Sequence, residues 1–152
     1  GSHETFEFTS PHAFDMITSS GWFEYEVANW LSSWKACREV WMNVIFPYNN
    51  KNPKNEIDII VNVGNKLLFV ECKTKIFDNT DIDKFTSAVK NYGGLGAKAI
   101  FITQENMKAQ GIEKCDTNKI AHYSLLDEKR CQRGKKALFN ILDAIMSENN
   151  VK

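Results

Sequence analysis

Apolar side chains recur at helical spacing in separate stretches of the chain. One stretch begins at Gly21, another covers residues 81–92 and ends at Gly93-Gly94, and the last covers residues 136–149. Apolar residues fall every three or four positions in each, which predicts an amphipathic helix with one apolar stripe. The first stripe consists of Phe23, Val27, Trp30, Leu31 and Trp34.

Strand patterns alternate with these helices. Residues 38–48 alternate and are rich in β-branched and aromatic side chains, which predicts a strand. Residues 55–75 predict a β-hairpin, and residues 98–103 predict a strand covered on both faces because they are continuously apolar. We also expect a helix near Glu105 and a strand near Ala121. An α/β sandwich, with a central mixed sheet containing an antiparallel hairpin and flanked by helices, buries all these faces.

Composition indicates a globular protein of one domain. The 152 residues are 43% hydrophobic and 25% charged, as in ordinary soluble domains. Basic and acidic residues number 19 each, so no global field attracts nucleic acid or a membrane, and any polyanion site must be a local patch. The apolar runs are shorter than a membrane span and no secretory signal is visible, so we expect a cytoplasmic protein with no membrane contact.

The cysteine and histidine spacings exclude a zinc or redox site. No CxxC pair occurs, and no histidine stands at zinc-ligand spacing from a cysteine, so we expect reduced, mostly buried thiols. His12 and His122 are isolated, and a surface or structural role is expected for each. The cysteines are Cys37, Cys72, Cys115 and Cys131.

The first residues lie outside the predicted fold. Residues 1–3 have the composition of a tag remnant, and residues 4–20 form a connecting segment. We expect the domain to occupy residues 21–152 and to be the C-terminal part of a longer protein.

Charged residues stand in the hairpin where a core is expected. A two-residue turn at Gly64-Asn65 sets the register, which places Asp58 opposite Glu71 and Glu56 opposite Lys73. Alternation then directs all four charged side chains to one face. The opposite face is predicted to be core, formed by Ile57, Ile59, Val61, Leu68 and Val70.

This arrangement favours a metal site. Two carboxylates directly across a strand pair repel each other, and the repulsion grows beside an apolar surface. A Mg²⁺ or Mn²⁺ ion between Asp58 and Glu71 removes the repulsion, because such hard cations take carboxylate oxygens. Lys73 would then orient a water or stabilise developing negative charge. The alternative is a solvated ion-pair cluster at the sheet edge.

Other polar segments are less specific. Lys51 and Lys54 stand in the loop of residues 49–55, which leads into the charged end of the hairpin, so we expect them to bind substrate phosphate. The basic run of residues 128–136 would also suit phosphates, with a solvated loop as the alternative. The segment "GGLGAK" does not meet the phosphate-loop pattern and is expected to be a helix stop.

Twelve residues separate Asp58 from Glu71 in "VECK", and this spacing resembles the PD-(D/E)xK nuclease superfamily, which has the restriction-endonuclease-like fold. More narrowly, "GWFEYEVANWL", "NEIDII", "LLFVECKTK" and "YGGLGAKAIFIT", in this order, resemble the nuclease domain of the CRISPR-associated Card and Can effectors. In those proteins a CARF domain that binds cyclic oligoadenylate precedes the nuclease domain, and residues 21–103 carry the resemblance.

The resemblance implies roles for individual residues. Asp58 and Glu71 match the metal-binding acids, Lys73 the catalytic lysine, and Glu24 the acid of the leading helix. It also implies that the main-chain carbonyl of Cys72 is a metal ligand. A carboxylate in the first turn of a helix is also favourable for its interaction with the helix dipole alone, which leaves the role of Glu24 open.

The sequence departs from the family in two respects. Ile57 stands where a proline often precedes the first acid, and no CARF domain fits within 152 residues. The resemblance implies a metal-dependent endonuclease of CRISPR antiviral defence, a hydrolase acting on DNA, including single-stranded DNA, or on RNA, and dimeric in the full-length protein. A repair or junction-resolving nuclease of the same superfamily, or an inactive binding module, is the alternative.

Overall fold

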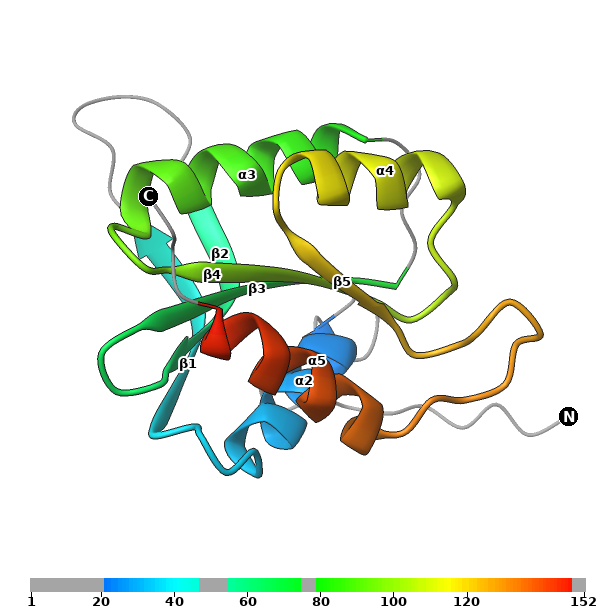
Figure 1. Cartoon of the computed structure of the whole chain (residues 1–152), viewed down its shortest axis with the longest axis horizontal. Helices are drawn as coiled ribbons and strands as arrows, with labels where there is room; N and C mark the ends of the chain where they lie inside the picture. Colours follow the sequence, from blue (N-terminus) through cyan, green and yellow to red (C-terminus); the bar gives the residue numbers. More distant parts are fainter. Residues whose placement is uncertain (1–20, 47–54, 75–78, 149–152) are drawn as a thin grey trace, which may run out of the picture.

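The structure, a computed structural model, describes residues 21–46, 55–74 and 79–148 (Figure 1). The tag remnant, the connecting segment, His12, Lys51 and Lys54 lie outside the described residues. Within the described part of the chain, no helix is both long and apolar enough to cross a membrane.

A five-stranded sheet with the strand order β1-β2-β3-β4-β5 forms the centre of the fold. The first three strands pair antiparallel, and β3 pairs parallel with β4, as does β4 with β5. This is the predicted mixed sheet with its antiparallel hairpin. The strands are β1 (Glu39–Phe46), β2 (Asn55–Asn62), β3 (Leu67–Lys73), β4 (Lys98–Thr103) and β5 (Ala121–Ser124).

Helices cover both faces of the sheet, with α3 and α4 on one face and α2 and α5 on the other (Figure 1). The α/β sandwich is therefore confirmed. The helix expected near Glu105 begins four residues later, because the chain first continues the sheet. The N–H of Gln104 donates to the carbonyl of Lys73, and that of Glu105 to Thr74. The helices are α2 (Gly21–Ser32), α3 (Thr80–Tyr92), α4 (Ala109–Thr117) and α5 (Lys135–Ser147).

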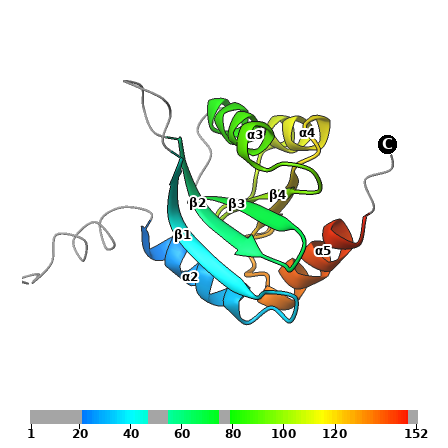
Figure 2. The same ribbon diagram turned by 90° about the vertical axis from the view of Figure 1, so that its left-hand side faces the viewer.

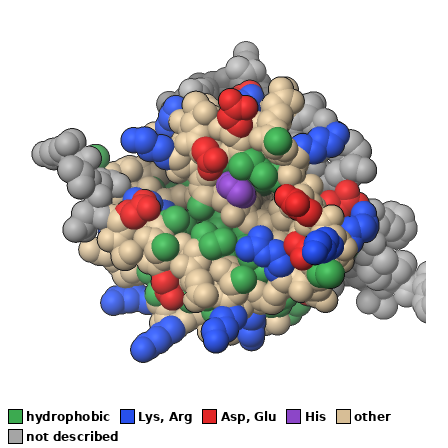
Figure 3. Space-filling model, turned by 45° about the vertical axis from the view of Figure 1, so that its right-hand side comes forward, with side chains coloured by type: hydrophobic (Ala, Val, Ile, Leu, Met, Phe, Trp, Pro, Cys, Tyr) green, Lys and Arg blue, Asp and Glu red, His purple; other side chains and the backbone are tan. Residues whose placement is uncertain are grey.

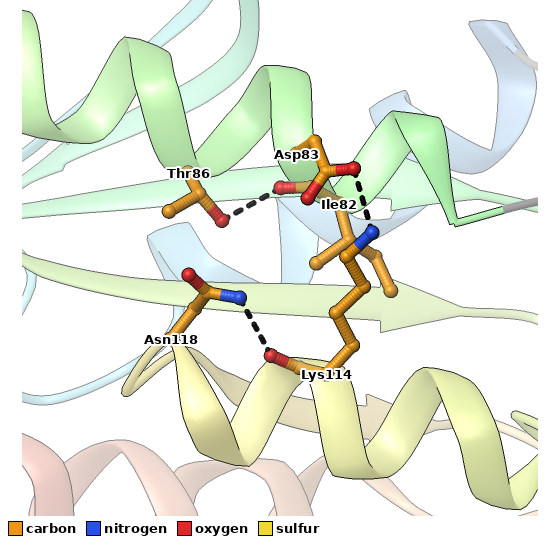
Figure 4. A network of polar contacts seen from close by, with 5 residues as sticks. All are labelled: Ile82, Asp83, Thr86, Lys114 and Asn118. Carbon is orange, nitrogen blue, oxygen red and sulfur yellow. Dashed lines mark hydrogen bonds and ion pairs between the residues drawn. The ribbon is translucent and has the colours of Figure 1, made fainter.

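Polar contacts join α3 to α4 (Figure 4). Lys114 Nζ lies 2.6 Å from Asp83 Oδ2, while Thr86 and Asn118 bond back to carbonyls of their own helices. The Lys114–Asp83 pair is partly exposed, so it contributes less than about 1 kcal/mol. Apolar packing under the helices therefore holds this layer in place.

The sheet separates two hydrophobic cores. Ile59, Val61, Leu68 and Val70 pack against α2 and α5, as the alternation predicted. Ile57 does not join them, so that part of the prediction is wrong. It packs in the other core, under α3.

The switch of Ile57 has a local backbone cause. Asn43 on β1 has a φ of 52°, in the left-handed region that asparagine tolerates better than most residues. Before it, Met42 pairs with Ile59 beside the α2 core, and after it Val44 pairs with Ile57 in the α3 core. Both strands therefore turn over at this point, and both curve strongly along their length (Figure 2).

The hairpin turn has the predicted register. The N–H of Val63 donates to the carbonyl of Lys66 at 3.0 Å, and Gly64 has a φ of 89° that suits glycine. Paired positions then run from Asn62–Leu67 to Ile59–Val70. The ladder ends there, so the predicted pairs Asp58–Glu71 and Glu56–Lys73 are not formed as main-chain pairs. The N–H of Cys72 bonds instead to the Asp58 side chain, and Glu56 is exposed.

The cysteines and the surface agree with the composition. All four cysteines are free thiols, as predicted, but only Cys72 and Cys115 are buried, while Cys37 is half-buried and Cys131 is exposed. Acidic and basic side chains are interspersed on the face drawn in Figure 3.

Candidate active site

Asp58, Glu71 and Lys73 meet where β2 and β3 separate. Lys73 Nζ lies 3.3 Å from Glu71 Oε1, and the Glu71 side chain is only 13% exposed. Glu71 and Lys73 alternate with buried Cys72 and follow Phe69, which packs under α3. The acid and the lysine therefore point to the α3 face, at the carboxyl end of β3.

A main-chain hydrogen bond fixes Asp58 to β3. The N–H of Cys72 donates to Asp58 Oδ2 at 2.8 Å. The Asp58 side chain therefore accepts the hydrogen bond from β3 that a main-chain carbonyl of β2 would have accepted if the ladder had continued.

Burial makes both carboxylates reluctant to ionise. Burial raises the pKa of Asp58 to about 6, opposed by the Cys72 N–H and by Lys73 and assisted by the charge of Glu24. Burial and the charge of Asp58 raise the pKa of Glu71 to about 8, opposed by Lys73. A cation near both groups would favour their ionised forms.

Lys73 remains a cation. Burial lowers its pKa, but the charges of Glu71 and Asp58 outweigh burial and raise it above the ordinary value. A lysine with a raised pKa is protonated at neutral pH and is a poor general base. It can stabilise negative charge or hold a water as a hydrogen-bond donor.

Glu24 approaches the same point from the opposite face of the sheet. It is half-buried in the first turn of α2, on the same side of the helix as buried Ala28 and Leu31. Its charge raises the pKa of Asp58 and of the Cys72 thiol. The inward orientation weighs against a role in the helix dipole alone.

Cys72 can contribute only through its main chain. Its thiol is fully buried, and burial, followed by the charge of Asp58, raises its pKa well above the ordinary value. A neutral, enclosed thiol is a poor metal ligand. The main-chain carbonyl between Glu71 and Lys73 is the remaining donor at this position.

Asp81 is the acid that the sequence analysis missed. It lies half-buried in the first turn of α3, and its charge raises the pKa of both Glu71 and Lys73. The signal was available, since α3 is the next helix after β3 and begins with acidic residues. Its closeness to Glu71 depends on how α3 lies on the sheet.

Other predicted residues are placed less directly. Glu56 is exposed, although its charge still raises the pKa of Asp58. The basic run follows the carboxyl end of β5, at the same sheet edge as Lys73, because β3, β4 and β5 are parallel. Within that run Arg133 packs 4.4 Å over the Tyr123 ring and bonds to the Ser124 carbonyl, so it has a structural role.

The donors fit a hard cation with few protein ligands. Among the described residues, no group of three or more acidic, cysteine or histidine side chains is close enough to hold a metal. Mg²⁺ is commonly bound by one or two carboxylates together with waters and substrate phosphates. Asp58 and Glu71, with the Cys72 carbonyl, provide this smaller set.

A cavity of about 780 Å³ lies at the opposite edge of the sheet and includes none of these residues. Its lining includes Lys90 and Lys119, near the carboxyl ends of α3 and α4, and Lys98 at the start of β4. Basic residues at helix carboxyl ends favourably offset the helix dipole, which accounts for at least Lys90 and Lys119. The cavity and the candidate active site are therefore separate features of the domain.

A family comparison decides the class of this site. The model of the Card1-like endonuclease domain matches residues 13–139, more than half of the chain. The chain belongs to the Card1-like endonuclease family. The resemblance found in the sequence is confirmed at this level, and the endonuclease domain is assigned as a nuclease.

Solved structures share the fold of the endonuclease domain. Can2 from Sulfobacillus thermosulfidooxidans, in complex with cyclic tetra-adenylate, has a TM-score of 0.69 and 24% identity over 93% of this chain and 40% of its own. Protein VC1899 from Vibrio cholerae has a TM-score of 0.63 and 21% identity over 91% of this chain and 36% of its own. Protein AF1548, of unknown function, has a TM-score of 0.55 and 15% identity over 84% of this chain and 79% of its own. A comparison with curated proteins gives no match.

The endonuclease domain therefore spans less than half the length of Can2 and of VC1899. At these identities the likeness establishes the fold alone. Substrate, metal and regulation are inferences from the site.

Proposed function

We propose that this domain hydrolyses phosphodiester bonds of nucleic acid in a reaction that requires Mg²⁺ or Mn²⁺. One observation carries the proposal. Two mostly buried carboxylates on adjacent strands, Asp58 and Glu71, lie where β2 and β3 separate, together with Lys73, whose Nζ is 3.3 Å from Glu71 Oε1. Burying two acids together is unfavourable without a cation, so a site that retains both is suited to binding one.

Each residue has a distinct role in this proposal. Asp58, oriented by the Cys72 N–H, and Glu71 hold the cation together with the Cys72 carbonyl. When bound, the cation polarises the phosphate and lowers the pKa of a coordinated water. Lys73 donates to the attacking water or stabilises the charge that develops on the phosphoryl oxygens. Glu24 holds a water at the same edge and accepts a proton from it.

DNA, including single-stranded DNA, is the proposed substrate, and cleavage of RNA is an outcome that the experiment below separates. Lys51 and Lys54, and the basic run of residues 128–136, are proposed to contact phosphates outside the site. The Can2 structure contains cyclic tetra-adenylate. We extend this to propose that the domain belongs to a dimeric CRISPR defence effector whose other, CARF-type domain binds a cyclic oligoadenylate.

Cleavage assays test the chemistry. The 152-residue chain is incubated with supercoiled plasmid, single-stranded DNA or RNA, with Mn²⁺, Mg²⁺ or EDTA. We expect cleavage with either cation, none with EDTA, and loss on Lys73→Ala. Lys84→Ala removes an exposed lysine from α3 and serves as the matched control. Cleavage that persists in EDTA, or that Lys84→Ala and Lys73→Ala reduce equally, would contradict the proposal.

A second experiment tests the regulation. The full-length protein is assayed with and without cyclic tetra-adenylate, and with linear tetra-adenylate as the control. Stimulation by the cyclic form alone supports the effector. Equal activity in all three conditions, combined with preference for branched DNA, would favour a repair or junction-resolving nuclease.

A further inference from the structure

The chain between β5 and α5 forms an ordered hairpin, which protrudes from the end of the sheet (Figure 1). Leu126 pairs with Gln132 in an antiparallel bridge. The main-chain N–H of Asp127 donates to the Cys131 carbonyl at 2.9 Å, as expected for a hairpin that ends in a three-residue loop. We call this hairpin, residues 125–133, the basic arm.

Asp127 holds the loop of the basic arm in one conformation. Its Oδ1 accepts the main-chain N–H of Lys129 at 2.9 Å and that of Cys131 at 2.7 Å. Its carbonyl accepts the N–H of Arg130 at 2.9 Å. The Asp127 carboxylate is therefore used inside the loop, whereas Lys129 and Arg130 are exposed. A main chain that is already fixed loses little entropy when its side chains bind a partner.

The base of the basic arm is anchored to the core. The N–H of Arg133 donates to the Leu125 carbonyl at 2.6 Å, and the Arg133 guanidinium lies 4.4 Å over the ring of buried Tyr123. The Tyr123 hydroxyl donates to the carbonyl of Gly134 at 2.9 Å. The basic arm therefore keeps a fixed position relative to β5 and, through the sheet, to the candidate active site.

Arg130 occupies a position at which glycine is favoured. Its φ is 60°, in the left-handed region. The third residue of a three-residue hairpin loop commonly has this conformation, and glycine suits it because a Cβ is unfavourable there. The arginine therefore lowers the stability of the loop while it places a long cationic side chain at the tip. Residues held in sparsely populated backbone regions cluster at ligand-binding and active sites.

The charge around the basic arm is positive. Residues 127–136 contain five basic and two acidic side chains, hence a net charge of +3, in a chain whose net charge is zero. Lys135 and Lys136 stand in the first turn of α5, which has no acidic residue although the helix dipole favours acids there. Positive charge is therefore concentrated here against a local cost, as in a patch that binds a polyanion.

The register of the sheet places the basic arm relative to Lys73. Lys73 pairs with Thr103 on β4, and Thr103 pairs with Ser124 on β5. Neighbouring strands are about 4.8 Å apart, so Ser124 lies about 10 Å to the side of Lys73. The chain then advances about 10 Å along the strand direction from Ser124 to Asp127, where the loop begins. The tip therefore lies roughly 15 Å from Lys73, which corresponds to about four nucleotides of a stacked strand.

We propose that Lys129 and Arg130 bind backbone phosphates of the nucleic-acid substrate about four nucleotides from the scissile phosphate. The inference rests on the proposed function, since it concerns the substrate of the same site. Lysine and arginine contact phosphate oxygens whatever the base, so the basic arm fixes the path of the strand and not its sequence. A substrate must then extend at least this far beyond the cut on the side of the arm.

Two matched glycine variants test the basic arm. Arg130→Gly removes a cation from its tip, and Lys119→Gly removes one from the turn between α4 and β5, at the opposite end of the sheet. Both residues have left-handed backbones, with φ of 60° and 58°, so glycine relieves strain at both and neither variant should melt below the parent. All proteins, the parent included, carry Lys73→Ala so that no substrate is cut. Affinity is measured for a labelled oligo-dT of about 12 nucleotides and for a duplex of equal length, at about 50 to 200 mM salt.

Arg130→Gly should weaken binding of both ligands about 5-fold near 0.1 M salt, and Lys129→Ala/Arg130→Gly about 25-fold. The slope of log affinity against log salt should become shallower by about 0.7 to 0.9 for each lost contact. Lys119→Gly should change the affinity less than about 2-fold. Thermal melting checks that each variant is folded. Equal affinities and equal salt slopes for Arg130→Gly and Lys119→Gly would overturn the inference.

The positions of the cuts test where the basic arm holds the strand. With Lys73 restored, cuts in an end-labelled single strand should stay about four nucleotides from one of its ends. Lys129→Ala/Arg130→Gly should allow cuts closer to that end. Parent cuts that come equally close to both ends would overturn the placement of the contact.

The two proposals fail separately. If Lys73→Ala has no effect on cleavage in the otherwise unaltered chain, the proposed function fails. If cleavage depends on Lys73 but binding does not depend on Lys129 or Arg130, only the inference about the basic arm fails.

Discussion

The main-chain N–H of Cys72 donates a 2.8 Å hydrogen bond to Oδ2 of Asp58, across the separating strands β2 and β3. Glu71 and Lys73 flank Cys72 in β3, so one short segment orients all three candidate catalytic side chains. A carboxylate that accepts a main-chain N–H keeps one orientation, because the donor is fixed by the sheet. Rigid strands are the elements on which a catalytic geometry is held most accurately.

A divalent cation is expected to bind between Asp58 and Glu71, because both acids are mostly removed from water and repel each other. Crystals soaked in Mn²⁺ should contain an ion that contacts both carboxylates. Asp58→Asn and Glu71→Gln should each weaken Mn²⁺ binding at least about 10-fold by calorimetry. Glu113→Gln, at an exposed position of α4, is the control and should bind as the parent does. An ion bound by only one of the two acids would contradict the prediction.

Lys73→Ala should lower cleavage by at least about 100-fold while the domain stays folded, because its charge serves the transition state. Removing Lys73 leaves Glu71 without its cation, but Glu71 can protonate, since its pKa is already raised. The loss in the free energy of unfolding should therefore stay near about 1 kcal/mol, well short of the cost of a stranded buried charge. Cleavage rates and urea unfolding measure the two effects. A variant that cuts near the parent rate, or that does not fold, would show that Lys73 has another role.

The stability of the metal-free domain should fall as pH rises. Folding raises the pKa of Asp58 from 3.8 to about 6 and that of Glu71 from 4.5 to about 8. A raised pKa in the folded state gives stability that is complete below the unfolded value and is lost as pH rises through the folded value. In EDTA, Tm should therefore decline between about pH 4 and pH 8.

Added Mn²⁺ should have the opposite pH dependence, because it binds the ionised carboxylates. The rise in Tm on adding Mn²⁺ should grow over the same pH range, as thermal scans in parallel buffers would measure. The double variant Asp58→Asn/Glu71→Gln should remove both the decline and the Mn²⁺ effect. A decline of equal size in that variant would assign the pH dependence to other groups.

Asn43 is expected to position Asp58. Its φ of 52° lies between the pairs Met42–Ile59 and Val44–Ile57, so it stands across β1–β2 from Asp58. Asn43→Ala should cost about 1 kcal/mol of unfolding free energy and should also reduce cleavage. Asn43→Gly should retain stability to within a few tenths of a kcal/mol and should retain cleavage, because glycine adopts this conformation freely. If Gly and Ala behave alike, the backbone conformation does not position Asp58.

The isolated domain is expected to be a weak nuclease that works better as a pair. With zero net charge, substrate capture depends on a few lysines, and a second copy doubles that footprint. Cleavage should rise more than linearly with protein concentration and fall sharply between about 50 and 200 mM salt. Cleavage rates measured at several protein concentrations and several salt concentrations test both dependences. Fast turnover proportional to concentration at physiological salt would instead indicate a stand-alone nuclease.

The sequence by itself determined the elements and the register of the hairpin. Periodicity identified the strands and helices, since it records which side of each element is buried. The Gly64-Asn65 turn fixed which residues of β2 and β3 face each other, because a two-residue turn allows one register. These are local properties, so the candidate triad Asp58, Glu71 and Lys73 could be found without a structure.

The tertiary structure decided how the candidate site is assembled. The ladder stops at Ile59–Val70, Ile57 changes core, and the Cys72 N–H turns to the Asp58 side chain. Asp81 and Glu24 approach from helices on opposite faces of the sheet. Each of these features depends on packing between segments far apart in the chain or on one strained backbone angle. The hydrophobic periodicity of the sequence contains no information on either.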